Sequence, residues 1–409
     1  MSGERGPEAG SGIGESLPPS PGRRFGDGLA VGPDLRGAAE VAVAQALAPL
    51  GGATPDLLCV FVAGGGRGAD GDAAAQAGLR AMELGGARTT IGATAGGVIG
   101  DGRGVEDVPA VAAWAAILPG VEIRPFRLTV ERSETGADVT GLPQLRADDR
   151  LAVLLVDPYS FPTGGFLQRC NAVLPGFPLV GGLASVASGP GGNRLFLDGE
   201  VLLGGAVGAL LGGDVAARAI VSQGCRPIGP TMVVTRAERN LLVELAGAPA
   251  YTRLGEIVTA LPPAEQELVG RGLQLGVAMN EYAEEHGRGD FLIRGVLGID
   301  VESGAVAVGD VVGVGQSVRF QVRDAAAADE DLTELLAGAV ADGPARGALL
   351  FSCNGRGRAM FPSADHDVGA VRAGLGTDGV AGFFAAGEIG PVGGRNHLHG
   401  FTASVLAFQ

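Results

Sequence analysis

The side chains best suited to chemistry gather near the C-terminus of the 409-residue chain. Segment 352–358 follows an apolar run and contains a thiol, an amide and two guanidinium groups. Segments 387–391 and 393–400 add a carboxyl, a third guanidinium, a second amide and two imidazoles. Such a mixture is typical of a site for a small polar ligand. The candidate ligand-binding residues are Cys353, Asn354, Arg356, Arg358, Glu388, Arg395, Asn396 and His399.

Each residue type has a role that it can fill in such a site. The three arginines would hold a carboxylate or another anion, because guanidinium groups bind planar anions through paired hydrogen bonds. Glu388 would bind an amine, or it pairs instead with Arg395 or accepts bonds from backbone N–H groups. Asn354, Asn396 and His399 would orient polar atoms of the ligand, while the surrounding glycines let the backbone approach it.

Cys353 has two interpretations. Arg356 and Arg358 would favour its thiolate, and a histidine near it in space would then make it the nucleophile of a hydrolase. A small buried hydrophobic residue at a strand end is the alternative, and the sequence favours it. Alkylation kinetics separate the two, because an activated thiolate reacts well below the ordinary cysteine pKa.

Two other motifs suggest cofactors. His397 and His399 would share one face of a strand and can bind a metal or haem, as a haem-based gas sensor requires. No carboxylate or cysteine cluster accompanies them, so hydrogen bonding is favoured, and neither a metal nor a cofactor is predicted. The run 64–68 is an incomplete nucleotide-binding fingerprint and is better explained as a tight turn.

Composition excludes several function classes. All 30 basic residues are arginine, so lysine-dependent Schiff-base and phosphate-loop chemistry is absent. The formal net charge is −15 without a basic cluster, which argues against nucleic acid as a partner. Four scattered cysteines fit a reducing cytoplasm. The longest apolar stretch, 201–213, is too short and glycine-rich for a membrane helix, so we expect no membrane partner.

The elements expected to position these residues form an internal repeat with three copies. Each copy reads strand, helix, strand, final strand, with short apolar strands typical of a sheet buried on both faces. The copies begin at Leu57, Leu151 and Ala348. Their expected elements are 57–62, 73–84, 89–94 and 111–118; 151–156, 165–173, 178–188 and 201–211; and 348–353, 365–375, 380–387 and 401–408.

The segment between the second and third copies does not follow this repeated order. The spacing of apolar residues predicts a long amphipathic helix over 262–282, strands over 291–299 and 318–322, and a helix over 329–339 after an alanine run. We predict an α/β fold of mixed sheets covered by helices, built from repeated strand-helix-strand-strand units in two related halves. The predicted divisions are a disordered lead-in, 1–28, and two α/β domains, 29–218 and 219–409.

Three segments resemble motifs of one known family. Phe351–Gly357 is similar to its strand-and-loop motif, Gly387–Pro391 and Leu398–Thr402 to its C-terminal signature, and Gln223–Pro230 to the opening of its C-terminal domain. The family is the FIST family, whose members combine an N-terminal and a C-terminal FIST domain. The resemblance is specific in the second half and looser in the first, and it covers the chain from about residue 30.

The resemblance implies cytoplasmic sensing of a small ligand, possibly an amino acid, with signal transduction through a protein partner. We expect no kinase, receiver or F-box-like segment within this sequence, so the resemblance does not specify the output route. We therefore expect a cytoplasmic small-ligand sensor that is more easily explained as a binding protein than as an enzyme. The alternatives are a hydrolase using Cys353 and a haem-based gas sensor. If the sensor prediction is right, Cys353 and Glu388 line the same site.

Overall fold

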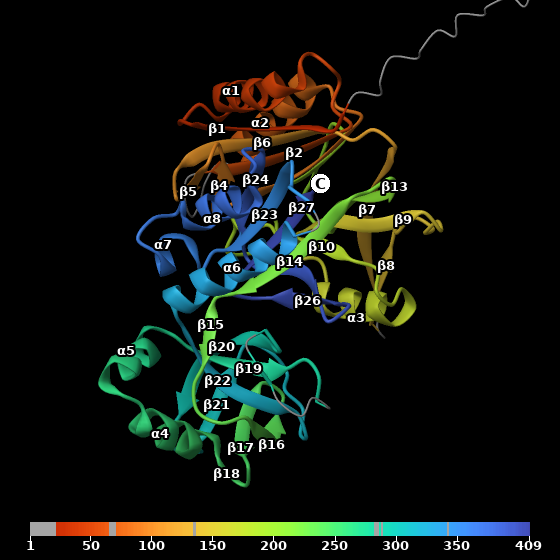
Figure 1. Ribbon diagram of the computed structural model, residues 1–409. Helices are drawn as coiled ribbons and strands as arrows, with labels where there is room; N and C mark the ends of the chain where they lie inside the picture. The colour runs from red at the N-terminus through yellow and green to blue at the C-terminus, as the bar shows by residue number, and fades with distance from the viewer. Residues whose placement is uncertain (1–21, 65–70, 134–135, 282–285, 288, 342) are drawn as a thin grey trace, which may run out of the picture.

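The computed structural model describes residues 22–64, 71–133, 136–281, 286–287, 289–341 and 343–409. They form a large α/β body and, below it in Figure 1, a smaller lobe made of the described residues between 225 and 323. The body contains three mixed sheets, each covered by helices. The predicted fold class is therefore confirmed, whereas the relation between two halves of the chain stays a prediction.

One local topology occurs in each sheet of the body. A central strand pairs in parallel with the next strand after a helix and antiparallel with a later strand. The strands predicted to begin the three copies are these central strands, and all are buried. The sets, each in the order central, parallel and antiparallel, are β2 (Leu57–Gly64), β3 (Thr89–Ala95) and β6 (Pro109–Ile117); β9 (Asp149–Val156), β10 (Leu179–Leu183) and β13 (Ala206–Gly213); and β23 (Gly347–Cys353), β24 (Val380–Ala385) and β27 (Thr402–Phe408).

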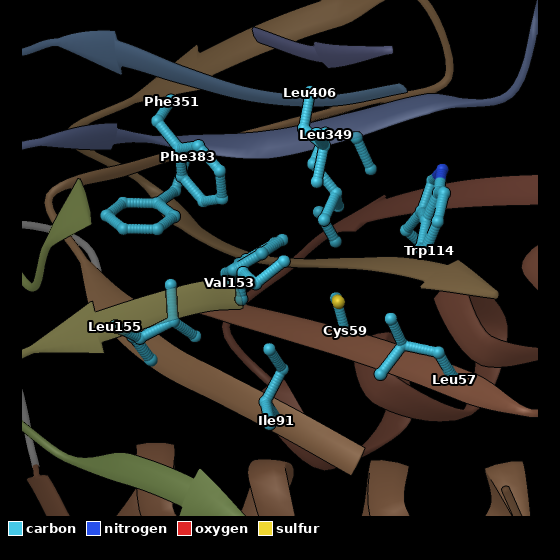
Figure 2. Close-up of a cluster of buried hydrophobic side chains, with 14 of the residues drawn as sticks. Leu57, Cys59, Ile91, Trp114, Val153, Leu155, Leu349, Phe351, Phe383 and Leu406 are labelled. Carbon is cyan, nitrogen blue, oxygen red and sulfur yellow. The ribbon is translucent and has the colours of Figure 1, made fainter. Parts of the chain in front are cut away.

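The apolar runs form central strands because both of their faces are buried. Successive side chains of a strand point to opposite faces. In β2, Cys59 and Phe61 face a core shared by all three sheets, whereas Leu58 and Val60 face helices. Figure 2 shows the shared core, with Trp114 of β6 and residues of β2, β9, β23 and β27 around one apolar centre. The three sheets are thus joined by one common core.

Helices cover the outer faces of the three sheets. α1 (Leu35–Leu47) and α2 (Gly71–Gly85) cover the first, α3 (Thr163–Val173) the second, and α6 (Ala325–Ala339) and α8 (His366–Leu375) the third. The Asp324 side chain accepts a hydrogen bond from the Ala327 N–H and caps α6. The alanine run 325–328 is consequently inside this helix, not ahead of it.

Two hairpins join sheets from distant parts of the chain. β4 (Gly97–Gly100) and β5 (Arg103–Glu106) extend the sheet of β23 through β24. β25 (Glu388–Val392) and β26 (Arg395–His399) extend the sheet of β9 through β10. The sequence predicted segment 387–399 as a loop beside segment 352–358. The loop part of this prediction was wrong, because the segment forms a hairpin that pairs with a different sheet. Glu388 at the start of the hairpin nevertheless lies beside Cys353.

The smaller lobe is a closed barrel in which β22 pairs with both β16 and β19. Two helices, α4 (Ala250–Ala260) and α5 (Pro263–Arg271), belong to this lobe. Its strands are β15 (Cys225–Pro227), β16 (Met232–Glu238), β17 (Leu241–Leu245), β18 (Ala248–Pro249), β19 (Leu273–Ala278), β20 (Phe291–Asp300), β21 (Ala305–Val308) and β22 (Ser317–Arg323). The strands predicted over 291–299 and 318–322 are confirmed.

The long helix predicted over 262–282 is wrong. α5 ends at Arg271, and Gly272 follows with a φ of 157°, where a Cβ would come within 2.7 Å of Arg323 Nε. Residues 273–278 then form β19, which pairs with β20 and β22 and closes the barrel. Leu275 fits the helical spacing but packs fully buried inside the barrel, so tertiary pairing overrides local periodicity.

The remaining strands complete the sheets of the body. β1 pairs with β6 from Arg24 onward, so the predicted lead-in of 1–28 extends too far; residues 1–21 lie outside the described part. The predicted domain boundary near 218 falls within β14 and stays a prediction. In the described part of the chain, no helix has the length and apolar character needed to cross a membrane. The strands are β1 (Arg24–Val31), β7 (Val121–Ser133), β8 (Gly136–Thr140), β11 (Leu195–Leu197), β12 (Glu200–Leu202) and β14 (Ala217–Gln223).

Candidate functional site

The carboxyl ends of parallel strands from all three sheets meet at one pocket of about 710 Å³. We call it the three-sheet pocket. Open α/β sheets bind ligands at the carboxyl ends of their strands, and here three sheets contribute. The lining residues come after β3 (Gly96, Gly97), β9 (Tyr159), β10 (Ser185, Val186, Ala187, Ser188), β23 (Asn354) and β24 (Ala386), with Glu106, Asp107, Arg358, Ala359 and Phe384 completing it. Most of the predicted glycine run 64–68, after β2, lies outside the described residues.

Both signs of charge line the three-sheet pocket. Arg358 Nε lies 3.5 Å from Glu106 Oε2, and Arg358 Nη2 lies 3.6 Å from Asp107 Oδ2. The Arg358 side chain is nevertheless 58% exposed, so a ligand can reach it. At Gly357, φ is 38° and a Cβ would come within 2.6 Å of Glu106 Oε1. Glycine therefore allows Glu106 to approach this loop.

One serine fixes the three sheets relative to each other at this pocket. Ser185 Oγ accepts a hydrogen bond from the Gly96 N–H at 3.0 Å and donates one to the Phe384 carbonyl. Gly96 follows β3, Phe384 lies in β24 and Ser185 follows β10, so the two bonds connect three different sheets. The Tyr159 hydroxyl donates to the Ala187 carbonyl at 3.1 Å. These hydrogen bonds tie together the segments that form the wall of the pocket.

Arg356 lies in a buried polar cluster beside this pocket rather than in its wall. Its guanidinium binds both carboxylate oxygens of Asp367, with Nε–Oδ2 at 2.7 Å and Nη2–Oδ1 at 2.8 Å. Ser352 Oγ donates to Asp367 Oδ2 at 2.6 Å. Burial opposes ionisation of Asp367, but Arg356 outweighs it and holds the pKa of that carboxyl below its usual value. Arg356 is fully buried, and Asp367 binds its Nε and Nη2, whereas its Nη1 has no hydrogen-bond partner among the described residues.

Glu388 is a further buried member of this cluster. Its Oε2 accepts hydrogen bonds from the backbone N–H of Thr402 at 3.2 Å and the hydroxyl of Thr402 at 2.8 Å. Burial raises the pKa of Glu388 to about 8, although the Thr402 bonds lower it. The carboxyl is therefore mainly protonated at neutral pH and suits an amine poorly. Its contacts match one of the two alternatives to amine binding, in which Glu388 accepts hydrogen bonds from the protein itself.

Cys353 lies beside Glu388, close enough for the two groups to interact. Burial first, and then the Glu388 charge, raise the pKa of the Cys353 thiol well above its usual value. Arg356 is bound to Asp367 and Arg358 is turned toward Glu106, so the arginines do not produce a thiolate. None of the hydrogen bonds found among the described residues joins Cys353 to a histidine. This geometry favours the buried, unreactive interpretation.

We expect native Cys353 to be nearly inert toward thiol reagents. All four cysteines are buried, and a protonated, enclosed thiol reacts slowly. Titration with a chromogenic disulfide at pH 8 should therefore find almost no fast-reacting thiol in the native protein and four after unfolding in urea. A fast-reacting native thiol that disappears in Cys353→Ser would instead support the hydrolase alternative.

The remaining predicted site residues line a second pocket of about 690 Å³, between the lobe and the body. The Asn396 side chain has a structural role. Its Oδ1 accepts a hydrogen bond from the Leu179 N–H, and its Nδ2 donates one to the Phe177 carbonyl, each at 2.8 Å. His399 is buried, with Nε2 3.0 Å from the Gly390 carbonyl oxygen. Arg395 is exposed and has no ion pair within the described part of the chain.

The eight predicted residues therefore do not converge on one open pocket. Asn354 and Arg358 line the three-sheet pocket, while Cys353, Arg356 and Glu388 lie in the buried cluster; the other three line the second pocket. Their role in ligand binding stays a prediction. The sequence argument missed Glu106, Asp107, Tyr159, Ser185 and Ser188. The available signal for the last three was position: Tyr159 comes shortly after the predicted strand 151–156, and Ser185 and Ser188 are polar residues in the last part of the predicted strand 178–188.

The two adjacent histidines do not form an open ligand pair. Their ring centroids are 5.8 Å apart, but His399 Nε2 is already hydrogen-bonded inside the sheet, so His399 does not fit an axial haem ligand. Burial lowers the pKa of His399 to about 3 and that of His397 to about 4, so both are neutral at physiological pH. Among the described residues, no group of three or more His, Cys, Asp or Glu side chains is arranged to hold a metal ion.

Comparison with known proteins agrees with this architecture. Residues 56–248 match the FIST N domain and residues 250–391 match the FIST C domain. An uncharacterized protein of Mycobacterium tuberculosis is 46% identical over 392 residues, which cover 94% of this chain and 99% of the relative. An uncharacterized protein of Mycobacterium bovis is 44% identical over 387 residues, covering 94% and 98%. The chain belongs to the FIST family, as the sequence motifs predicted.

Proposed function

We propose that this protein is a cytoplasmic sensor that binds a small polar metabolite in the three-sheet pocket and signals through a protein partner. FIST domains are generally regarded as sensory domains that bind small ligands. One observation carries the assignment to this pocket: strand ends from three separate sheets converge there. A ligand that contacts all three sheets and fits one arrangement of them better than another would shift the protein toward that arrangement, which is what a sensor needs for a readout.

The charges in the pocket support an amphoteric ligand such as an amino acid. Arg358 offers a guanidinium to a carboxylate, while Glu106 and Asp107 offer carboxylates to an amine. Asn354 has an exposed side chain, and Tyr159 and Ser188 add hydroxyl groups. The volume of about 710 Å³ lies within the usual range for small-molecule sites. The buried cysteines accord with a reducing cytoplasm.

A thermal-shift screen against amino acids and related small metabolites tests this proposal. A ligand at 100 times its dissociation constant should stabilise the wild-type protein by about 2.7 kcal/mol. We expect Arg358→Ala to fold normally and to lose most of this gain, because the ligand carboxylate loses its guanidinium partner. The matched control is Arg395→Ala, which removes an exposed arginine from the other pocket and should keep the full shift.

Two outcomes contradict the proposal. If Arg358→Ala keeps the whole ligand-induced shift, the ligand binds elsewhere. If Arg395→Ala alone loses the shift, the second pocket is the sensory site and the three-sheet pocket is not.

A further inference from the structure

The second pocket, between the lobe and the body, has no part in the proposed function. We call it the interlobe pocket. One wall is formed by β20 and the residues after β21, and the opposite wall by β26 and α3. Its volume of about 690 Å³ is large enough for a small metabolite. A ligand in it would touch both parts of the molecule.

The interlobe pocket is locally positive in an acidic protein. Its charged side chains are two arginines, Arg294 and Arg395, and one aspartate, Asp310, whereas the whole chain carries a formal charge of −15. Asp310 is already paired with Arg294, with Oδ2 2.6 Å from Nε. Arg395 therefore faces the pocket without a carboxylate partner among the described residues. An anion is the natural complement of this arrangement.

Arg294 is held in place at the junction. Besides its bond to Asp310, its Nη1 donates to the Ile293 carbonyl at 2.9 Å and to the Leu398 carbonyl of β26 at 3.1 Å. The second bond crosses from the lobe to the body. The side chain is only 16% exposed, so its guanidinium is already oriented, and binding an anion would not cost much of its side-chain entropy.

His397 lies within the field of both arginines. Burial first, and then the charges of Arg395 and Arg294, lower the pKa of its imidazole. The two guanidinium groups therefore act on one imidazole, although they come from different parts of the chain. A neutral imidazole can donate one hydrogen bond and accept another, which suits the polar atoms of a ligand between them.

We propose that the interlobe pocket binds a small organic anion, a carboxylate or a phosphate ester, between Arg395 of the body and Arg294 of the lobe. This is a separate site from the three-sheet pocket. Because the anion would contact both walls, it would strengthen the junction that the bond from Arg294 to Leu398 already makes. Carboxylates and phosphates share the same chemistry here, since guanidinium groups donate charge-assisted hydrogen bonds to both. Arg395 can offer paired donors, whereas Arg294, whose Nε and Nη1 are already bonded, offers its Nη2.

Titrating the full-length protein with inorganic phosphate and, separately, with succinate tests this inference. The chain has only 4 histidines, so their side-chain NMR signals can be followed individually, and His397→Gln assigns the relevant one. We expect a saturable shift of the His397 signal with at least one anion. Arg395→Ala should weaken binding about tenfold, the effect of losing one charge-assisted hydrogen bond. Arg358→Ala, which removes an arginine from the other pocket, should leave the affinity unchanged.

A response to phosphate alone would identify a phosphate ester as the ligand class, and a response to succinate alone a carboxylate. The inference fails if neither anion produces a saturable shift at millimolar concentrations. It fails equally if Arg395→Ala and Arg358→Ala weaken binding to the same extent, since the anion affinity would then depend only on the overall charge of the protein. Neither failure of anion binding changes the thermal shift that we expect amino acids to produce through Arg358, so the two proposals can fail independently.

Discussion

Replacing Gly382 with alanine should destabilise the protein by about 3 kcal/mol or more, because overpacking against a backbone atom cannot be relieved by a side-chain rotation. Gly382 lies in β24 opposite Leu350 of β23. A Cβ at this position would be 1.6 Å from the Leu350 carbonyl oxygen and 2.6 Å from its carbonyl carbon. The two parallel strands must separate to admit a methyl group, which would disturb the shared core.

The matched control is Gly369→Ala in α8, where a Cβ meets nothing within 4 Å. This change should stabilise the protein by about 0.5–1 kcal/mol, because alanine restricts the unfolded chain and favours helix. Urea unfolding of the two variants measures both effects. A Gly382→Ala variant within about 1 kcal/mol of wild type, less than a typical overpacking penalty, would mean that the strands are not this close.

Breaking the buried ion pair in the polar cluster should have a comparable effect. Arg356→Met removes the guanidinium, keeps much of the volume and leaves the Asp367 carboxylate buried without its partner. The loss of one partner of a buried pair costs about 3–5 kcal/mol. Replacing both residues with apolar ones, as in Arg356→Met with Asp367→Leu, should recover much of this loss, because no unpaired charge then remains.

The exposed Arg358 provides the comparison for this prediction. Arg358→Ala should change the free energy of unfolding by no more than about 0.5 kcal/mol, since exposed ion pairs contribute little. Unfolding in urea, followed by circular dichroism, compares the three variants. Equal stability of Arg356→Met and Arg358→Ala would show that the pair does not have the buried geometry described above.

Much of the fold could be predicted from the sequence because the central strands are continuous apolar runs. The runs at 57–62, 151–156 and 348–353 have no polar face and are only six residues long, a pattern and a length typical of a strand buried on both sides. The helix over 262–282 failed for the opposite reason. Its spacing suited a helix locally, but Gly272 ends α5 and barrel closure takes residues 273–278 into β19.

The site was less predictable because it depends on contacts between distant segments. The sequence placed Asn354 correctly at the carboxyl end of a central strand. It did not reveal that the hairpin of β25 and β26 leaves the third unit and that β25 pairs with β10, which takes Arg395 to another pocket. Nor did it show that Asp367, eleven residues after Arg356, would bind that guanidinium. Sequence distance alone does not specify such pairing.

Fluorine NMR of protein labelled with 3-fluorotyrosine tests the central claim, ligand binding in the three-sheet pocket, most directly. The chain has only 3 tyrosines. Tyr159 lines the three-sheet pocket, whereas Tyr251 lies in α4 of the lobe. A ligand found by thermal shift should move the resonance that disappears in Tyr159→Phe and leave the Tyr251 resonance in place. A ligand that moves the Tyr251 resonance and not that of Tyr159 would contradict the account.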